Sequence, residues 1–149
     1  MDDLDRILEA AWRTPSSSNQ QRWAFVAVTD RVKLAELAEV WRGAAFVGKA
    51  AAAIALVAPL EDEARARESV QYDLGQATMS IMLAAADLGI GSGHAAVVDQ
   101  ELARRLLGIP EDHFCAWLIG LGHPADRPLA PIRTPNRRPI DEVVHRERW

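Results

Sequence analysis

The chain has 149 residues, 49% of them hydrophobic and 26% charged, and a formal net charge of -4. This balance is typical of a globular protein and excludes a disordered or fibrous chain, and the length suits one domain, residues 1–149, with a sizeable core. The longest nearly uncharged apolar run, Ala50 to Leu60, falls short of the about 20 residues that cross a bilayer, so we expect a buried strand there and no membrane span.

The cysteine content indicates a cellular compartment, and the distribution of charge indicates which classes of partner are expected. Cys115 is the only cysteine, so no intramolecular disulfide can form, and the chain has no signal-peptide pattern; both features favour the reducing cytoplasm. Residues 1–126 carry 11 Lys and Arg against 18 Asp and Glu, whereas the tail, residues 127–149, carries 6 Arg against 3 acids. Because only the tail is basic, we expect no nucleic acid as a partner. The tail suits a small anionic ligand or an acidic partner surface, although solvated charges explain any one arginine equally well.

Periodicity predicts two helices and a strand in the first third of the chain. Apolar residues recur at helical spacing over residues 4–12, and Pro15 ends that helix because proline disfavours helical geometry in the residue before it. Residues 23–29 are rich in β-formers and predict a strand. Asp30 stands at the N-cap position of a second helix, which Gly43 ends.

The middle of the chain predicts a second strand and a long helix. Residues 50–57 are almost all apolar and predict a strand. Residues 70–88 predict a helix that is apolar nearly all round, which is typical of a central helix buried against a sheet or against another subunit. Three glycines, Gly89, Gly91 and Gly93, form the turn that ends this helix.

The last third predicts one more helix and one more strand before the tail. Asp99 caps a short helix that Gly108 closes, and residues 114–119 predict a third strand. Residues 124–139 are expected to be extended, and residues 141–149 to form a short terminal element. The strands are few and the glycine-rich turn follows a helix, which argues against a Rossmann fold. We therefore predict an α+β fold, a small sheet flanked by helices with a long buried central helix.

A polar loop, Pro15-Ser-Ser-Ser-Asn-Gln-Gln-Arg-Trp23, lies between the first helix and the first strand. Its hydroxyls and amides can donate and accept hydrogen bonds, and on these residues alone a serine-rich turn explains it best. The string resembles the Pro-Ser-x-x-Asn-x-Gln-Pro-Trp motif of the nitroreductase family, with Arg22 in place of the second proline. The resemblance implies that one set of loop residues faces the flavin or ribityl groups of FMN, usually across a dimer interface: Ser16, Ser17, Asn19 and Gln21.

Three further stretches are similar to the same family and occur in the same order. Residues 73–92 resemble its central helix and the following turn, and residues 107–124 contain its Leu-Gly-Ile-Pro-Glu-Asp and Leu-Gly-x-Pro passages. Residues 137–144 end the chain as many members end. The resemblance covers nearly all of residues 4–149 and implies a nitroreductase-like fold, FMN as cofactor and a homodimer.

Two departures from the family pattern concern the cofactor. Members normally begin with an Arg-x-Ser-x-Arg segment that holds the FMN phosphate, and this chain starts after that point; the family's tail arginine falls on Arg137, with Arg138 beside it as a replacement donor. Near the flavin ring the resemblance implies Gly93, Ala96 and Val97, where many members have a glycine-containing pair. We expect Val97 to crowd the place where glycine allows close approach.

The resemblance implies an oxidoreductase in which FMN takes hydride from NAD(P)H and passes electrons to a nitroaromatic, a quinone or a similar small aromatic acceptor. The cofactor carries the chemistry, so no catalytic acid–base pair is needed. The missing first segment motivates an alternative: a non-catalytic, flavin-free member that serves as a binding module or partner subunit. A wrongly placed start codon would make that segment's absence uninformative.

Other reactive side chains have structural explanations. Cys115 lies in an apolar strand without a neighbouring base and is expected in the core. The four histidines share no metal-ligand spacing, so we expect no metal. Asp73 is either a buried polar partner or a helix-start carboxylate, and we favour the second. Trp149 is expected to pack on a partner subunit. Core positions are expected for the other tryptophans: Trp12, Trp23, Trp41 and Trp117.

Overall fold

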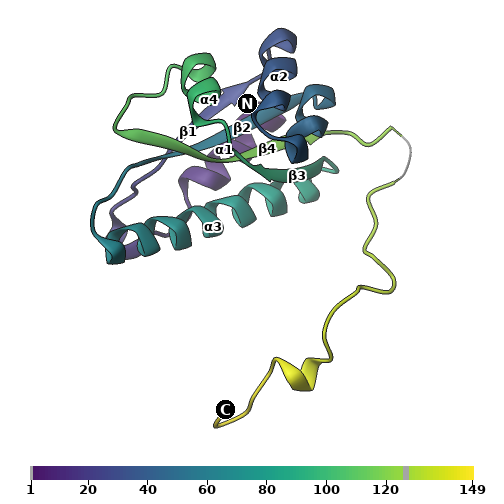
Figure 1. Cartoon of the computed structure of the whole chain (residues 1–149). Coiled ribbons are helices and arrows are strands. Elements are labelled where there is room, and N and C mark those ends of the chain that lie inside the picture. The colour runs from purple at the N-terminus through teal and green to yellow at the C-terminus, as the bar shows by residue number, and fades with distance from the viewer. Residues whose placement is uncertain (1, 126–127) are drawn as a thin grey trace.

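The computed structural model describes residues 2–125 and 128–149, and its centre is a small antiparallel sheet. Its four strands lie in the order β1-β2-β4-β3, and every neighbouring pair is antiparallel (Figure 1). The strands are β1 (Ala24–Val28), β2 (Ala52–Pro59), β3 (Gly91–Ala96) and β4 (His113–Gly122). The predicted α+β class with a small sheet is confirmed, because parallel pairing, the basis of a Rossmann fold, does not occur among these strands.

Helices cover both faces of the sheet. The α-helices are α1 (Asp3–Trp12), α2 (Arg31–Leu37), α3 (Ala64–Asp87) and α4 (Gln100–Leu107). Short 3-10 helices connect them: η1 (Ser17–Asn19), η2 (Ala38–Val40), η3 (Arg42–Lys49) and η4 (Ile140–Glu142). In Figure 1, α2 and α4 lie on one face and α1 and α3 on the other. Within residues 2–125 and 128–149, no helix is long and apolar enough to span a membrane.

β2 joins the two halves of the core because both of its faces are buried. Ala53, Ala55 and Val57 point into the cluster shared with α2 and α4, which also holds Leu34 and Leu118. The alternate residues Ile54, Leu56 and Ala58 point into the cluster shared with α1 and α3. A strand covered on both sides needs an unbroken apolar run, which is the pattern that predicted it.

The predicted helix caps are confirmed at two positions. The side chain of Asp30 accepts a hydrogen bond from the backbone N–H of Lys33 at 2.9 Å, and the side chain of Asp99 accepts one from Leu102 at 2.8 Å. Gly108 ends α4 with a φ of 68°, in the left-handed region that glycine adopts readily.

The second helix does not run to Gly43 as predicted. α2 ends at Leu37, and Trp41 has an extended backbone (φ -169°, ψ 146°) that separates η2 from η3. Gly43 lies inside η3, where a Cβ atom would stand 2.1 Å from the ring of Trp41. The glycine therefore makes room for the indole rather than ending a helix.

The glycine-rich turn was also predicted wrongly in part. Gly89 ends α3 with a φ of 71°, but Gly91 and Gly93 belong to β3 and pair with Gly122 and Gly120 of β4. Glycine has a low strand propensity, so local sequence hides this strand. Its pairing with β4 is a long-range interaction that the turn interpretation missed.

Two of the four tryptophans expected in the core are exposed. The side chain of Trp12 is 61% exposed and lies against the guanidinium of Arg13, and Trp41 is also exposed. Trp23 and Trp117 are partly buried and pack against the cluster under α1 and α3. Helical spacing alone overestimates the burial of a large residue at the end of a helix, where the neighbouring turn is missing.

Leu56→Ala tests the two-sided core. Leu56 is fully buried in β2, so we expect the variant to lose about 2–5 kcal/mol of unfolding free energy through lost contacts and a residual cavity. Leu60→Ala, at an exposed leucine just beyond the same strand, is the control and should change stability by no more than about 0.5 kcal/mol. Denaturant unfolding followed by circular dichroism measures both, and equal losses would contradict the described core.

Candidate functional site

The Ser16–Gln21 loop has an unusual backbone. Ser18, Asn19 and Gln21 have φ values of 51°, 55° and 51°, in the left-handed region that residues other than glycine rarely enter. Such conformations cost roughly 1–3 kcal/mol each and persist where the surroundings enforce them, although asparagine tolerates them better than most residues. The loop therefore carries backbone strain that its sequence pattern does not reveal.

Hydrogen bonds inside the loop account for part of its shape. The hydroxyl of Ser16 accepts a hydrogen bond from the backbone N–H of Gln21 at 3.0 Å, and the backbone N–H of Asn19 donates to the carbonyl of Ser16 at 2.9 Å. The backbone N–H of Trp23 donates to the carbonyl of Gln21 at 2.8 Å. These bonds close the loop on itself and leave its tip toward solvent.

Asp73 on α3 binds the loop through hydrogen bonds to Ser17. The backbone N–H of Ser17 lies 3.0 Å from both carboxylate oxygens of Asp73, and the Ser17 hydroxyl lies 3.0 Å from one of them. Asp73 is only 3% exposed. Our preference for a helix-start carboxylate was therefore wrong, because α3 begins at Ala64, nine residues earlier, and Asp73 is a buried polar partner.

The side chains of Asn19 and Gln21 remain available to a ligand. Both residues are exposed, and among residues 2–125 and 128–149 their side chains form one hydrogen bond, a donation from the Gln21 amide to the carbonyl of Asn19 at 3.2 Å. Arg22, which stands where the family motif has proline, forms a half-buried ion pair with Glu61 at 3.0 Å. It ties the end of the loop to the segment that precedes α3.

The second predicted region lies at the end of β3. Ala96 is the last residue of the strand and is half-buried, whereas the side chain of Val97 is 8% exposed and packs in the core under α2 and α4. The expectation that Val97 crowds a flavin at this place stays a prediction. The structure places its side chain in the core under α2 and α4 rather than on the surface of the strand end.

Gln100 holds the backbone next to this strand end. Its side-chain N–H groups donate to the carbonyls of Val97 at 2.9 Å and Cys115 at 2.8 Å, and its oxygen accepts from the N–H of Cys115 at 3.0 Å. The β3–β4 pairing ends at Ala96 and Trp117, and the β2–β4 register shifts between Trp117 and Cys115. The amide of Gln100 therefore continues the ladder where strand pairing stops.

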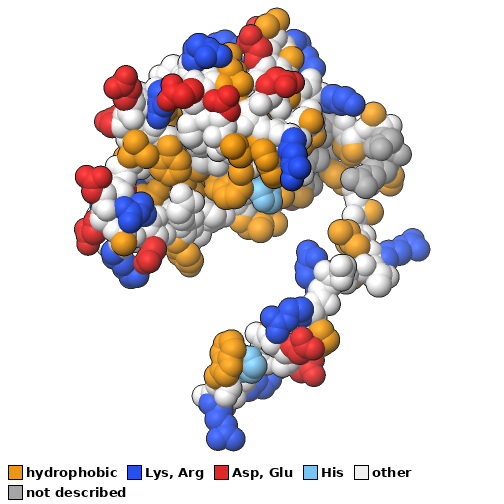
Figure 2. Space-filling model, in the orientation of Figure 1, with side chains coloured by type: hydrophobic (Ala, Val, Ile, Leu, Met, Phe, Trp, Pro, Cys, Tyr) orange, Lys and Arg blue, Asp and Glu red, His pale blue; other side chains and the backbone are white. Residues whose placement is uncertain are grey.

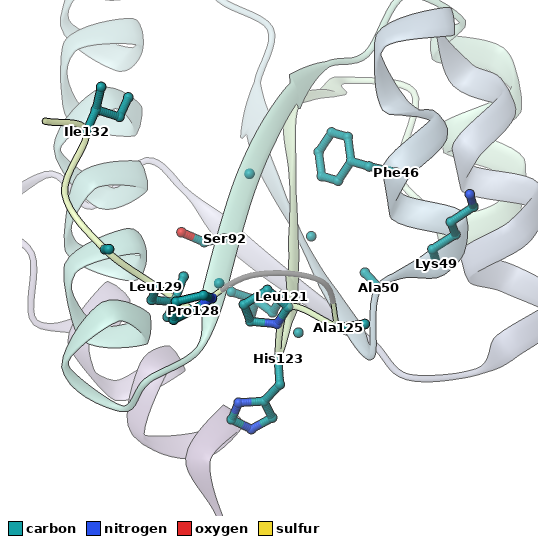
Figure 3. A pocket seen from close by; sticks show the side chains of 16 residues that line it. Phe46, Lys49, Ala50, Ser92, Leu121, His123, Ala125, Pro128, Leu129 and Ile132 are labelled. Carbon is teal, nitrogen blue, oxygen red and sulfur yellow. The ribbon is translucent and has the colours of Figure 1, made fainter. Parts of the chain in front are cut away.

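Gly93 lines a separate hollow beside the edge strand β3 and its neighbour β4. The hollow measures about 770 Å³, and Figure 3 shows Phe46 and Lys49 on one side of it and Pro128 and Leu129 of the tail on another. Cross-strand partners Gly93 and Gly120 form its floor, and the ring of Phe46 lies over both. Cβ atoms there would stand 3.3 and 2.8 Å from that ring.

The predicted phosphate ligands lie in the tail, which runs away from the body of the chain (Figure 1). Arg137 donates to the carbonyl of its neighbour Asn136 at 2.8 Å, and Arg138 donates to the carbonyl and the carboxylate of Glu142. The predicted site residues are thus spread over the loop, the β3 edge and the tail. Within one copy, Ser17 forms hydrogen bonds with Asp73 of α3, and Gly93 lines the hollow. The two arginines form hydrogen bonds with other residues of the tail.

The remaining candidates have no evident chemistry. Cys115 is buried in the core as predicted, and burial raises the pKa of its thiol to about 12. The nucleophilic thiolate is therefore scarce at neutral pH. Over residues 2–125 and 128–149, no group of three or more His, Cys, Asp or Glu side chains is placed to hold a metal ion.

Comparison with known proteins identifies the class of this chain. The model of the nitroreductase family matches residues 1–61 and 44–123. A protein of Archaeoglobus fulgidus, whose name assigns it to the NADH dehydrogenase/NAD(P)H nitroreductase group, is 34% identical over 152 residues, which cover 99% of this chain and 86% of that protein. The chain belongs to the nitroreductase family.

Two further relatives carry more specific names. The FMN reductase [NAD(P)H] of Bacillus subtilis is 25% identical, and the match covers 99% of this chain and 66% of the relative. The solved structure of an FMN-dependent nitroreductase from Clostridium difficile R20291 superposes with a TM-score of 0.83 at 25% identity, covering 99% of this chain and 87% of the other. The fold inferred from four stretches of sequence is thereby confirmed.

Gln100→Ala tests the side-chain ladder at the end of β3. The change leaves the carbonyls of Val97 and Cys115 and the N–H of Cys115 without this partner, so we expect a loss of about 2 kcal/mol of unfolding free energy. Gln71→Ala, at an exposed glutamine of α3, is the control and should stay within about 0.5 kcal/mol. Equal stability of the two variants in urea unfolding would show that the amide of Gln100 is dispensable.

Proposed function

We propose that this chain is an FMN-dependent oxidoreductase that takes hydride from NAD(P)H and passes electrons to a nitroaromatic, a quinone or a similar small aromatic acceptor. The observation that carries the proposal is the Ser16–Gln21 loop, which is held in a strained shape with the amides of Asn19 and Gln21 exposed. The family assignment and the relatives named for FMN support it. The single buried cysteine supports a reducing cytoplasm as its compartment.

The residues present fit a flavin mononucleotide. Asn19 and Gln21 offer amide donors and acceptors, which match the carbonyl, imide and hydroxyl groups of the ring and ribityl chain. The Val97 side chain is buried in the core, so it would not stand between a flat ring and the backbone of residues 96–97. Arg137 and Arg138 offer planar guanidinium groups, whose geometry suits a phosphate.

When bound, FMN supplies the two-electron chemistry, accepting hydride and later releasing electrons. The protein's work is to bind, orient and stabilise charge. Asn19 and Gln21 are positioning groups that hold a ring through hydrogen bonds, and the arginines neutralise a phosphate. No side-chain acid–base pair is required for such a transfer.

A second copy of the chain would complete the site. α3 is buried on one side against the sheet, but Tyr72, Met79 and Leu83 leave large apolar side chains exposed on it. Figure 2 shows a band of hydrophobic side chains across the body and cationic side chains along the tail. We propose an isologous homodimer, in which the α3 surface meets its copy and Arg137 and Arg138 approach the other copy's loop. In such a dimer, the loop, the end of β3 and the tail arginines, which are separate within one copy, could contribute to one site.

Asn19→Asp tests the loop as a flavin site. Aspartate tolerates the left-handed backbone of this position but lacks the amide donor and adds negative charge, which opposes an electron-rich ring. We expect FMN affinity to fall about tenfold or more, corresponding to about 1.4 kcal/mol, while the melting temperature of the flavin-free protein stays nearly unchanged. Fluorescence titration with FMN and thermal unfolding measure the two quantities.

Gln20→Glu is the matched control for this variant. Gln20 is an exposed neighbour with a right-handed backbone, so the substitution adds the same charge without touching a proposed ligand group. Its FMN affinity should stay within about twofold of the wild type, as screening weakens exposed charges. Equal titration curves for Asn19→Asp and the wild type would remove the site assignment. Absence of FMN binding by the wild type would favour the flavin-free alternative.

Leu83→Glu tests the proposed homodimer. Leu83 is 62% exposed on α3, so a carboxylate there would be buried without a partner in an isologous interface but would be harmless on a free surface. We expect the wild type to be dimeric and the variant monomeric at micromolar concentration in light scattering. Val32→Glu, at an exposed valine of α2 on the other face of the sheet, should remain dimeric. A monomeric wild type would exclude the shared site.

A further inference from the structure

We propose that Asp73 is a positioning residue that holds the Ser16–Gln21 loop in its ligand-binding shape before any ligand arrives. The consequence for flavin binding rests on the proposed function of this loop, whereas the mechanical role of Asp73 does not. In the described part of the chain, the side-chain hydrogen bonds of Asp73 go to Ser17 and Gln76 and to no exposed loop side chain. Asp73 acts through Ser17, which stands at the start of the strained segment.

The contacts of Asp73 are concentrated on one residue. Both carboxylate oxygens lie 3.0 Å from the backbone N–H of Ser17, and one of them also lies 3.0 Å from the Ser17 hydroxyl. Gln76, one turn further along α3, donates to the same carboxylate only at the long distance of 3.5 Å. A buried carboxylate needs donors, and Ser17 provides the short ones. The bond therefore constrains the loop and satisfies Asp73 at the same time.

The loop needs such an anchor because its own backbone resists the observed shape. Ser18, Asn19 and Gln21 all have positive φ values, and the hydrogen bonds within the loop join residues that move together. Bonds of that kind preserve a local turn but do not fix its place on the protein. Asp73 supplies the connection to a rigid element, since α3 is a helix of 24 residues.

The anchor point on α3 is itself immobilised by the core. Val70, Leu74 and Ala77 surround Asp73 along the helix, and all three are buried against the sheet. A second link lies nearby, where the hydroxyls of Thr14 and Ser80 are 2.8 Å apart. The segment from Thr14 to Ser17 is therefore attached to α3 at two points, but only the Asp73 bond reaches the loop.

This geometry makes α3 a shared support for two parts of the proposed site. Its inner face carries Asp73, and its outer face carries Tyr72 and Leu83, which we assign to the dimer interface. When only a fraction of molecules has the competent loop, apparent affinity falls by that fraction. Without Asp73 the loop would relax toward ordinary backbone conformations. Affinity would then fall although no contact to the flavin is removed.

The first test compares Asp73→Ala with Asp73→Asn in FMN titrations well below their melting temperatures. We expect Asp73→Ala to weaken FMN binding about tenfold, as it would if about one molecule in ten kept the competent loop. Asp73→Asn keeps one acceptor oxygen for Ser17 and should recover most of that loss. At saturating FMN, both variants should show the wild-type visible circular dichroism, because the bound geometry is the same.

The second test does not depend on flavin. Amide hydrogen exchange of residues 17–21 in the flavin-free protein should accelerate at least tenfold in Asp73→Ala and much less in Asp73→Asn. Ser80→Ala is the control, because it removes the Thr14 link on the same helix and leaves Ser17 bonded to Asp73. Exchange in its loop should match the wild type.

The outcomes separate the two proposals. Unchanged loop exchange in Asp73→Ala would refute the positioning role, whatever happens with flavin. If loop exchange is faster in Asp73→Ala but the wild-type protein binds no FMN, the role of Asp73 would be supported and the proposed function would be rejected. If Asp73→Ala and Ser80→Ala accelerate loop exchange equally and lower FMN affinity equally, Asp73 would be a general stability contact. That result would also refute the proposal.

Discussion

The arrangement of this structure depends on β2, a strand whose two faces must both be buried away from water. Its alternate side chains enter two separate apolar clusters, so one layer of helices cannot suffice and the chain has to return to the sheet from both sides. α2 and α4 cover one face of β2, and α1 and α3 cover the other. The edges of the sheet and the loops between layers are consequently the places where polar groups can be exposed, and the candidate site is built there.

Polar side chains at those edges replace interactions that regular structure cannot supply. Gln100 extends the ladder beyond the last strand pair, and Asp73 provides acceptors for a loop whose backbone is partly left-handed. Both residues are supports, and neither is the group expected to meet a ligand. Supports of this kind restrict the conformations of the loop and of the strand end, which would reduce the conformational entropy that a ligand has to overcome.

The sequence predicted most elements because their signals are local. Apolar runs, N-caps such as Asp30 and the glycine at the end of α4 act within a few residues. β3 was not predicted, because its pairing with β4 joins residues 21 to 31 positions apart and glycines carry no side-chain pattern. Asp73 was misjudged for the same reason, since its partner Ser17 is 56 residues away. The loop motif was recognised by resemblance, but its left-handed backbone and its anchor could be seen only in three dimensions.

The tail has a consequence for how the protein behaves on dilution. Residues 128–149 are all exposed and contain one short 3-10 turn, so they have no core of their own. Terminal segments of this kind are ordered by what they dock against. If the arginines of the tail complete a phosphate site on another copy, cofactor retention is linked by mass action to protein concentration. A dilute solution would then release both the partner and the flavin, and a crowded cell would keep them together.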